Sequence, residues 1–453
     1  MKKSKQKEKV EFASIPILNP NSAGIDIGDT VHAVAVPEDR DNNPVREFGT
    51  MSCDLDEIIL WLKECNIETV AMESTGVYWK PLFSLLVFNG FEVYLVKPDH
   101  VKNITGRKTD TGDAEWIRLL HSFGLLKSCY LPEGIQEELR TLVRFRRTIL
   151  QDSSRFVLRM EKALELMNIK LHTVISDLTG KTGMAIVKAI IDGERDAKNF
   201  LPLVDRRIKA NHDTIQKSLQ GHWRKDQLFM LAENFRLYQS FQIESLRIDQ
   251  EIELVLQEYA ASENGGELQN NNVSQPEAQN AKKKQKNSLA FDTRKYLQCI
   301  LGTDVLEIHG ISEVGALEIF AETGTDMDKW PSAKHFVSWL NLCPNNKISG
   351  GKLLSSRIRK GSGTAGQAFK MAANAVQRSD HWLGDYFRRM KTKGGNKYAI
   401  VALANKLATI YYKMVKEKLP FMPVDNVEYM QKQKSAKIAY LTRKLEFLKQ
   451  QSA

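Results

Sequence analysis

The sequence predicts an α/β domain followed by a mostly helical region. Strand-like and helix-like segments alternate up to about residue 120, apolar residues recur at helical spacing after Pro132, and a polar segment interrupts the chain at 262–289. At 453 residues the chain is too long for one compact core, so we expect two or three domains.

The first 130 residues carry the alternating pattern. AGIDIGDTVHAVAV (23–36) has two short β-branched runs around a Gly-Asp turn, which predicts a β-hairpin. Residues 55–65 have helical spacing, and ETVAMES (68–74) predicts a strand. Residues 77–88 predict a second helix, and EVYLVKP (92–98) predicts another buried strand that ends at its proline.

Two long amphipathic helices are predicted after Pro132. Apolar residues recur at steps of three and four between Leu139 and Met167, and again between Leu231 and Val255. This spacing is compatible with an antiparallel coiled coil, with dimerisation, and with an ordinary helical bundle inside one chain.

Composition divides the chain further. Residues 262–289 are rich in Asn, Gln, Ser and Lys and poor in core formers, which predicts a disordered linker. The expected plan is a basic disordered tail (1–21), an α/β domain (22–130), a helical middle (131–261), the linker (262–289), a mostly helical C-terminal domain (290–420) and a charged helical tail (421–453).

The charge balance favours a polyanionic partner. Lysine and arginine exceed aspartate and glutamate by 65 to 55, so the net charge is +10. The five cysteines form no Cys-x-x-Cys pair, which indicates neither a zinc knuckle nor a disulfide framework. No segment reaches the roughly 18 apolar residues that span a bilayer. We therefore expect a cytoplasmic protein that does not enter membranes.

Four acidic residues are candidate metal ligands. Asp26 lies in the first predicted strand, Glu73 ends a later strand, and Asp110 and Asp113 are three residues apart where a helix begins. Acids at strand ends and on one helical face can converge on two Mg²⁺ ions about 3.5–4 Å apart, as phosphodiester chemistry requires.

Each acid also has a structural alternative. Asp110 suits a helix N-cap, Asp113 suits the first turn of a helix, and Glu73 suits an exposed strand end. Asp29 competes with Asp26 because it lies in the adjoining turn. GIDIGDT also resembles the phosphate loop of actin-like sugar kinases, but the second phosphate loop and the glycine-rich adenosine site of such kinases are not found in the sequence.

The C-terminal region offers two DNA-contacting segments. In LEIHGISEVGALEIFAETG, Gly310 and Gly315 lie between two helical patterns, which is typical of a helix-hairpin-helix and equally of a plain tight turn. NLCPNNKISGGKLLSSRIRKGSG predicts a polar, glycine-rich loop before a helix. Its basic residues suit a phosphodiester: Lys347, Lys352, Arg357, Arg359 and Lys360.

Ser349 is the candidate nucleophile of this loop. A serine hydroxyl is weak at neutral pH and needs a base, a metal ion or a cationic phosphate clamp. Ser355, Ser356 and Ser362 are not distinguished from it by the sequence alone, and a serine that only contacts phosphate is an alternative.

Taken in order, IDIGDT, AMESTGVYW, KTDTGDA, DLTGKTGM, GISEVGALEIFAETG and CPNNKISGGK resemble the DEDD-type transposases of bacterial insertion sequences, a serine-dependent family guided by a bridge RNA. The resemblance covers residues 22–420. It implies a ribonuclease-H-like (RuvC-like) domain, a central coiled coil and a helical transposase domain with a helix-hairpin-helix. Where many relatives carry Arg-x-Gly-x-x-Ser-Lys after the serine, this chain has GGKLLSSRIRKGSG.

The resemblance also implies site residues and partners. Asp26, Glu73, Asp110 and Asp113 would bind Mg²⁺, and Ser349 would become linked to DNA. The partners would be the element ends and target DNA, a structured noncoding guide RNA, and further copies of the chain in a dimer or tetramer near the nucleoid. The residues expected to contact nucleic acid are Lys108, Gly310, Gly315, Lys352, Arg357, Arg359 and Lys360.

The sequence therefore predicts a transposase that cuts and rejoins DNA through a phosphoserine. One alternative is a RuvC-like, Mg²⁺-dependent, structure-selective endonuclease in which water is the nucleophile. Another is a nonenzymatic nucleic-acid-binding protein whose acids only cap helices.

Overall fold

The computed structural model describes residues 16–74, 76–98, 101, 112–263, 286–359, 361, 363–423 and 426–451. The chain divides into two compact units, Met1–Leu131 and Pro132–Ala453, and each is described by itself. The finer division of the second unit into a helical middle, a linker, a C-terminal domain and a tail stays a prediction, and most of the predicted linker lies outside the described residues. Within the described ranges, no helix combines the length and apolarity needed to cross a membrane.

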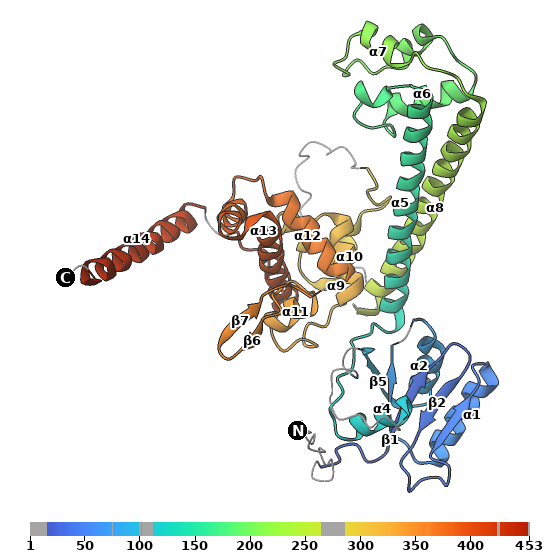
Figure 1. Cartoon of the computed structure of the whole chain (residues 1–453), viewed down its shortest axis with the longest axis vertical. Coiled ribbons are helices and arrows are strands. Elements are labelled where there is room, and N and C mark those ends of the chain that lie inside the picture. Colours follow the sequence, from blue (N-terminus) through green and yellow to red (C-terminus); the bar gives the residue numbers. More distant parts are fainter. Residues whose placement is uncertain are drawn as a thin grey trace, which may run out of the picture. The chain divides into compact units, whose positions relative to one another are not determined.

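In the described part of the first unit, five strands form one mixed sheet in the order β3-β2-β1-β4-β5 (Figure 1). Strand β1 pairs antiparallel with β2, which pairs antiparallel with β3, whereas β1–β4 and β4–β5 are parallel. This topology is consistent with a ribonuclease-H-like fold. The strands are β1 (Ser22–Ile27), β2 (His32–Ala35), β3 (Val45–Phe48), β4 (Thr69–Glu73) and β5 (Glu92–Val96).

Different helices cover the two faces of this sheet. On one face, Ile25 of β1 and Met72 of β4 belong to the core that also contains the apolar sides of α1 and α2. On the other face, Ala71 of β4 and Val96 of β5 pack with Trp116 of α4. Because side chains alternate along a strand, each face of β1 and β4 has its own set of residues. The helices are α1 (Ser52–Glu64), α2 (Trp79–Phe88) and α4 (Asp113–Ser122).

The second unit begins with two long helices, α5 (Gly134–Leu166) and α8 (Lys225–Glu263), which lie side by side (Figure 1). Gln242 of α8 donates a hydrogen bond to Ser153 of α5, and Asp249, further along α8, forms an ion pair with Arg146, which comes before Ser153 in α5. The two helices therefore run antiparallel. Both Arg146 and Asp249 are buried, so this ion pair also fixes the register of the helices. The pair forms within one chain, and its coiled-coil character stays a prediction.

A small subdomain, here called the tip, joins the C-terminal end of α5 to the N-terminal end of α8 (Figure 1). Its apolar residues, such as Ile186, Phe200 and Leu219, form a core with Met160 of α5 and Leu231 of α8. The tip therefore has its own packed interior. Its elements are η2 (Leu171–Thr173), α6 (Lys181–Ile191), η3 (Ala197–Leu203) and α7 (His212–Ser218).

The remaining described part of the second unit is mostly helical. Phe336, Phe369 and Tyr411 are fully buried and pack ring against ring at its centre. Gly395 has non-helical backbone angles, so α13 is two helices joined at a kink. The elements are α9 (Thr293–Leu301), η4 (Val305–Glu307), α10 (Glu313–Thr323), α11 (Ala333–Trp339), β6 (Lys347–Ser349), β7 (Lys352–Ser355), α12 (Thr364–Val376), α13 (Trp382–Glu417) and α14 (Asn426–Gln451).

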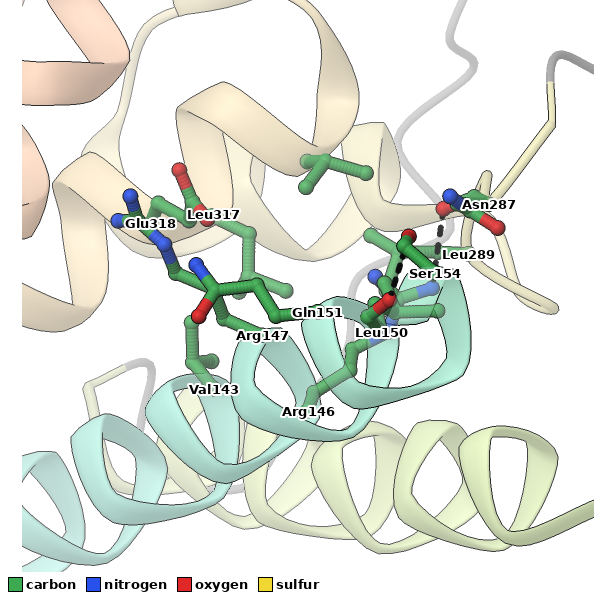
Figure 2. Close-up of a pocket in the computed structure, with 11 residues that line it drawn as sticks. Val143, Arg146, Arg147, Leu150, Gln151, Ser154, Asn287, Leu289, Leu317 and Glu318 are labelled. Atoms are coloured by element: carbon green, nitrogen blue, oxygen red, sulfur yellow. Dashed lines mark hydrogen bonds between the residues drawn. The ribbon is translucent and has the colours of Figure 1, made fainter. Parts of the chain in front are cut away.

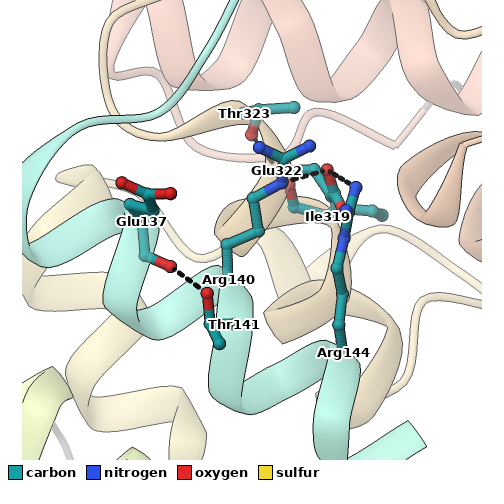
Figure 3. A network of polar contacts seen from close by, with 7 residues as sticks. All are labelled: Glu137, Arg140, Thr141, Arg144, Ile319, Glu322 and Thr323. Atoms are coloured by element: carbon teal, nitrogen blue, oxygen red, sulfur yellow. Dashed lines mark hydrogen bonds and ion pairs between the residues drawn. The ribbon is translucent and has the colours of Figure 1, made fainter. Parts of the chain in front are cut away.

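Charged side chains join α10 to α5. Glu322 is buried and accepts hydrogen bonds from Arg140 (3.0 Å) and Arg144 (2.7 Å), as Figure 3 shows. One helical turn away, Glu318 and Arg147 line a pocket of about 230 Å³ between the same helices (Figure 2). Burial raises the pKa of the Glu318 carboxyl. Two acids of α10 thus face arginines of α5 on successive helical turns.

Candidate active site

Two of the predicted metal ligands lie side by side on the sheet. The parallel register of β1 and β4 pairs Ile25 with Met72, and its next step brings Asp26 beside Glu73. Neighbouring strands are about 4.8 Å apart, and residues paired across them share a face. Both acids are half-buried, and both belong to the face that α4 covers.

The packing of α4 brings Asp113 to the same place. A Cβ on Gly24 would lie 2.3 Å from the Ala114 carbonyl oxygen, so the first turns of α4 rest directly on β1. At the other end of α4, His121 Nε2 lies 2.9 Å from Thr69 Oγ1, at the start of β4. The helix therefore runs antiparallel to these strands, with its N-terminus at their carboxyl ends.

The lengths of the elements match at this edge. From Gly24 to Asp26 the strand advances about 6.6 Å, and from Arg118, which also touches Gly24, back to Asp113 the helix advances about 7.5 Å. Asp113 thus lies at about the level of Asp26 and Glu73. Acids from two strands and one helix share one edge of the sheet.

The start of α4 corrects one alternative interpretation. Its N-cap is Gly112, whose backbone N–H donates to the Glu115 carboxylate at 3.1 Å. The prediction that Asp110 caps this helix is therefore wrong. Asp113 is exposed in the first turn, where the helix dipole also favours a negative charge. Asp110 itself and Lys108 lie outside the described residues.

The donor set suits a hard cation. Carboxylate oxygens are the ligands that Mg²⁺ prefers, and these three are held by rigid elements instead of loops. Within the described ranges, no three acids, histidines or cysteines are close enough together to hold a metal ion. Asp26, Glu73 and Asp113 each have polar interactions in the structure. A metal site here therefore needs small side-chain movements or the fourth acid.

Two buried histidines lie in this unit, His32 near Asp26 and His121 at the opposite end of α4. His32 of β2 is paired with Ile27 of β1. Burial lowers the pKa of His32, although the negative charge of Asp26 opposes this effect. Burial lowers the pKa of His121 to about 4. A neutral His121 can bond Thr69 without introducing a charge beneath α4, so its role is to hold the helix on the sheet.

Ser349 lies on an exposed β-hairpin, not on the loop that the sequence predicts. Strands β6 and β7 pair antiparallel, and Ser349 is paired with Lys352 across the turn. Both residues of that turn, Gly350 and Gly351, have positive φ (+53° and +76°). A two-residue Gly-Gly turn is a hairpin signal, and it was the clue in the sequence.

The cross-strand pairing gives Ser349 a specific neighbour. Paired residues lie on the same face of a hairpin, so Ser349 and Lys352 share one face while Ile348 and Leu353 share the other. All four residues are exposed. Within the described part of the chain, the Ser349 hydroxyl makes no side-chain hydrogen bond, so Lys352 is the cationic residue that the hairpin itself brings to the face of Ser349.

Arginines follow this hairpin. Arg357 and Arg359 are exposed, and the chain there is held by a hydrogen bond from the Asn345 N–H to the Arg357 carbonyl at 3.0 Å. Ser355 is half-buried and Ser356 is exposed. Lys360 and Ser362 lie outside the described residues. Of the site residues predicted in this segment, Ser349 and Lys352 are brought together, because they are cross-strand neighbours in the hairpin.

Gly310 and Gly315 have structural roles of their own. Gly310 has φ +92°, and a Cβ there would lie 2.3 Å from Val376 of α12, so a glycine is required by packing. Gly315 is in the first turn of α10, where its N–H donates to the N-cap Ser312 Oγ at 3.1 Å. Packing thus explains the glycine at 310 without DNA, whereas the N–H bond at 315 could be made by another residue, and the DNA contact predicted for both stays a prediction.

Two family models match the chain in the expected order. A model described as a transposase, for DEDD transposases of IS110 elements, matches residues 23–169, and the model of the transposase IS116/IS110/IS902 family matches residues 302–388. The chain belongs to the IS110 family of transposases. The first match contains Asp26, Glu73 and Asp113, and the second contains Ser349. No curated protein matches the chain.

The family assignment decides the class of activity. This IS110 transposase is a DNA transposase, that is, a recombinase, and it binds DNA. A DEDD domain also indicates dependence on divalent metal in general. The nonenzymatic interpretation and the sugar-kinase interpretation are set aside. Residues 170–301, which include the tip, fall between the two matches.

Proposed function

We propose that this transposase cuts and rejoins DNA at the ends of its insertion sequence and at its target through a covalent phosphoserine at Ser349. The proposal is supported by the strand register, which brings Asp26 beside Glu73, and by the direction of α4, whose N-terminus with Asp113 lies at the carboxyl ends of the same strands. Carboxylates at such an edge serve phosphodiester chemistry, which is the chemistry of a transposase.

The carboxylates are proposed to hold metal. Asp26, Glu73, Asp113 and Asp110, which lies outside the described residues, would hold two Mg²⁺ ions. When bound, these ions supply electrostatic stabilisation of negative charge on the phosphate. Through these ions the acids would fix the position of the phosphodiester, because without the ions the carboxylates and the phosphate repel each other.

Ser349 is proposed to attack phosphorus. The Ser349 hydroxyl loses its proton, an Oγ–P bond forms, and the P–O bond of the scissile linkage breaks. The departing oxygen takes up a proton and becomes the free hydroxyl of the other strand end. A later attack by a DNA hydroxyl on the phosphoserine reverses this exchange. The bond energy is conserved, so no high-energy cofactor is needed.

Basic residues would neutralise the phosphate during this exchange. Lys352, on the same face as Ser349, is placed to contact the phosphate under attack, and Arg357 and Arg359 extend the positive charge along the DNA. Further contacts to the DNA backbone are proposed for Lys108, Gly310, Gly315 and Lys360.

The serine and the carboxylates belong to different units of the chain. We therefore propose a composite site assembled in a dimer or tetramer, with the long helices α5 and α8 forming a coiled coil and a structured guide RNA selecting the DNA. Recombination of chromosomal DNA would place the protein in the cytoplasm, at the nucleoid.

The test is a covalent-adduct assay. Purified protein, co-purified RNA and labelled element-end DNA are incubated with Mg²⁺ and separated by denaturing electrophoresis. We expect an adduct in the wild type that is lost in Ser349→Ala and Asp113→Ala. Ser356→Ala is the matched control, because Ser356 is an exposed serine of the same segment.

The outcome separates two nucleophiles. Loss of the adduct in both variants, with the control intact, supports the proposal. Cleaved DNA without an adduct, at the same rate in Ser349→Ala, would instead favour the RuvC-like endonuclease that uses water.

A further inference from the structure

The elements of the tip, η2 to α7, belong to the described residues that lie outside both family matches. The tip lies between the two family matches, at the far ends of α5 and α8, and has its own core. Residues 167–224 contain ten lysines and arginines against six acids, so this small subdomain carries a substantial share of the net charge. An isolated basic module suggests a ligand of its own.

The tip has an open pocket of about 560 Å³. One wall is the segment before α6 together with the first turn of that helix, and the opposite wall is the loop between η3 and α7. The walls are tied together where the Asp205 N–H donates to Thr182 Oγ1 at 2.9 Å. Three cationic residues line it: Lys181, Arg207 and Lys209.

The two acids of the pocket are already paired. Arg207 donates to both oxygens of Asp205, at 2.9 and 2.8 Å, and these bonds hold the pKa of Asp205 well below its usual range. Lys286 and Thr179 donate to Asp177. Although burial raises the pKa of Asp177, these hydrogen bonds lower it overall. Both acids are therefore ionised and neutralised inside the protein.

The pocket keeps positive charge that its two acids do not neutralise. Lys181 and Lys209 are exposed at the pocket, and within the described residues neither forms an ion pair. The pairing with Asp205 uses Nε and Nη2 of Arg207, so Nη1 stays outside that pair. Two lysines and one held guanidinium around one open pocket form an arrangement that attracts a phosphate.

We propose that this pocket binds a phosphodiester of a nucleic-acid backbone, so that the tip is a second nucleic-acid contact of the transposase. A backbone contact through lysines carries no sequence information, and it would position DNA or RNA along the helical pair. The inference does not depend on Ser349 being the nucleophile, since binding can be measured without cleavage.

The first test measures salt-dependent binding of the full-length protein. Fluorescence anisotropy follows a labelled DNA duplex in one arm and a labelled RNA hairpin in the other, without divalent metal. The variant Lys181→Gln/Lys209→Gln is compared with Lys188→Gln/Lys198→Gln. The control changes the same number of exposed charges in the same subdomain, away from the pocket.

We expect the pocket variant to lower the slope of log K against log salt by about 1 for each lysine that contacts a phosphate, and the control to leave it unchanged. The arm that responds identifies DNA or RNA. Equal losses in both double variants would reduce the effect to general positive charge and overturn the proposal, as would no loss in either arm.

A second measurement needs no variant. Lysines of the wild-type protein are acetylated with and without nucleic acid and quantified by mass spectrometry. Lys181 and Lys209 should be protected several-fold more than Lys188 and Lys198. Equal protection of all four lysines, or none, would contradict the proposal even if the variants failed to fold.

Discussion

Gly24 is the position where a single methyl group tests the geometry of the carboxylate edge. In Gly24→Ala the new Cβ would lie 2.3 Å from both the Ala114 carbonyl oxygen and the Arg118 nitrogen. These are backbone atoms of α4, so no side chain can turn away. Ordinary contact begins at 3.4 Å, which means that α4 must retreat by about 1 Å.

The expected effect has two parts. Overpacking against a fixed helix costs about 1–3 kcal/mol of unfolding free energy. Moving Asp113 about 1 Å from Asp26 and Glu73 should also slow Mg²⁺-dependent cleavage on the order of 100-fold. The loss of activity should therefore exceed what the fraction of unfolded protein explains.

The assay combines cleavage rates over a Mg²⁺ titration with urea unfolding. Gly90→Ala is the matched control, because Gly90 has φ +87° and nothing within 4 Å of a new Cβ. It should cost about 1–2 kcal/mol through backbone strain while leaving α4 in place. If Gly24→Ala cleaved as fast as Gly90→Ala, with the same Mg²⁺ dependence, the close packing of α4 would not be what positions Asp113.

Three further predictions concern other contacts. The pKa of His121 is about 4 in the folded protein and about 6.5 in the unfolded chain, so the unfolded chain binds the proton first as the pH falls through this window. The free energy of unfolding should therefore drop by about 3 kcal/mol between pH 7 and pH 4. Urea unfolding at the two pH values should show a smaller drop in His121→Gln. Glu322→Gln should lower the free energy of unfolding by about 1–3 kcal/mol, because it weakens the contacts with both arginines. Arg144→Ala should lower it by about 1 kcal/mol or less, because the Arg144 side chain is 46% exposed. Similar losses for the two variants in urea unfolding would argue against this ranking. Lys352→Met should slow adduct formation on the order of 100-fold. Lys347→Met, two cross-strand pairs away, should have little effect, and equal rates for the two variants would speak against a specific role of Lys352 as the neighbour of Ser349.

Much of the fold could be predicted from local pattern. The hairpin at 23–36, the strands ending at Glu73 and Val96, and the long helices α5 and α8 are confirmed, because each has a clear period of two or of three to four residues. Strand β3 was missed because VREF is short and only partly buried, so it shows no alternation. The hairpin at Ser349 was taken for a loop because both of its strands are exposed.

The sequence by itself determined the family and the list of candidate acids, since motif order and residue type survive without coordinates. It left open what each acid does. Asp113 and an N-cap residue look alike in sequence. The contact of Gly24 with α4, together with that of Thr69 with His121, reveals which way the helix runs and which ends of the strands it reaches. Likewise, the hydrogen bond between Asp205 and Thr182, which ties the two walls of the tip pocket together, joins residues that are 23 positions apart. These neighbours are decided by tertiary structure because the direction of a helix and the register of a strand are set by packing against segments that are distant in the chain.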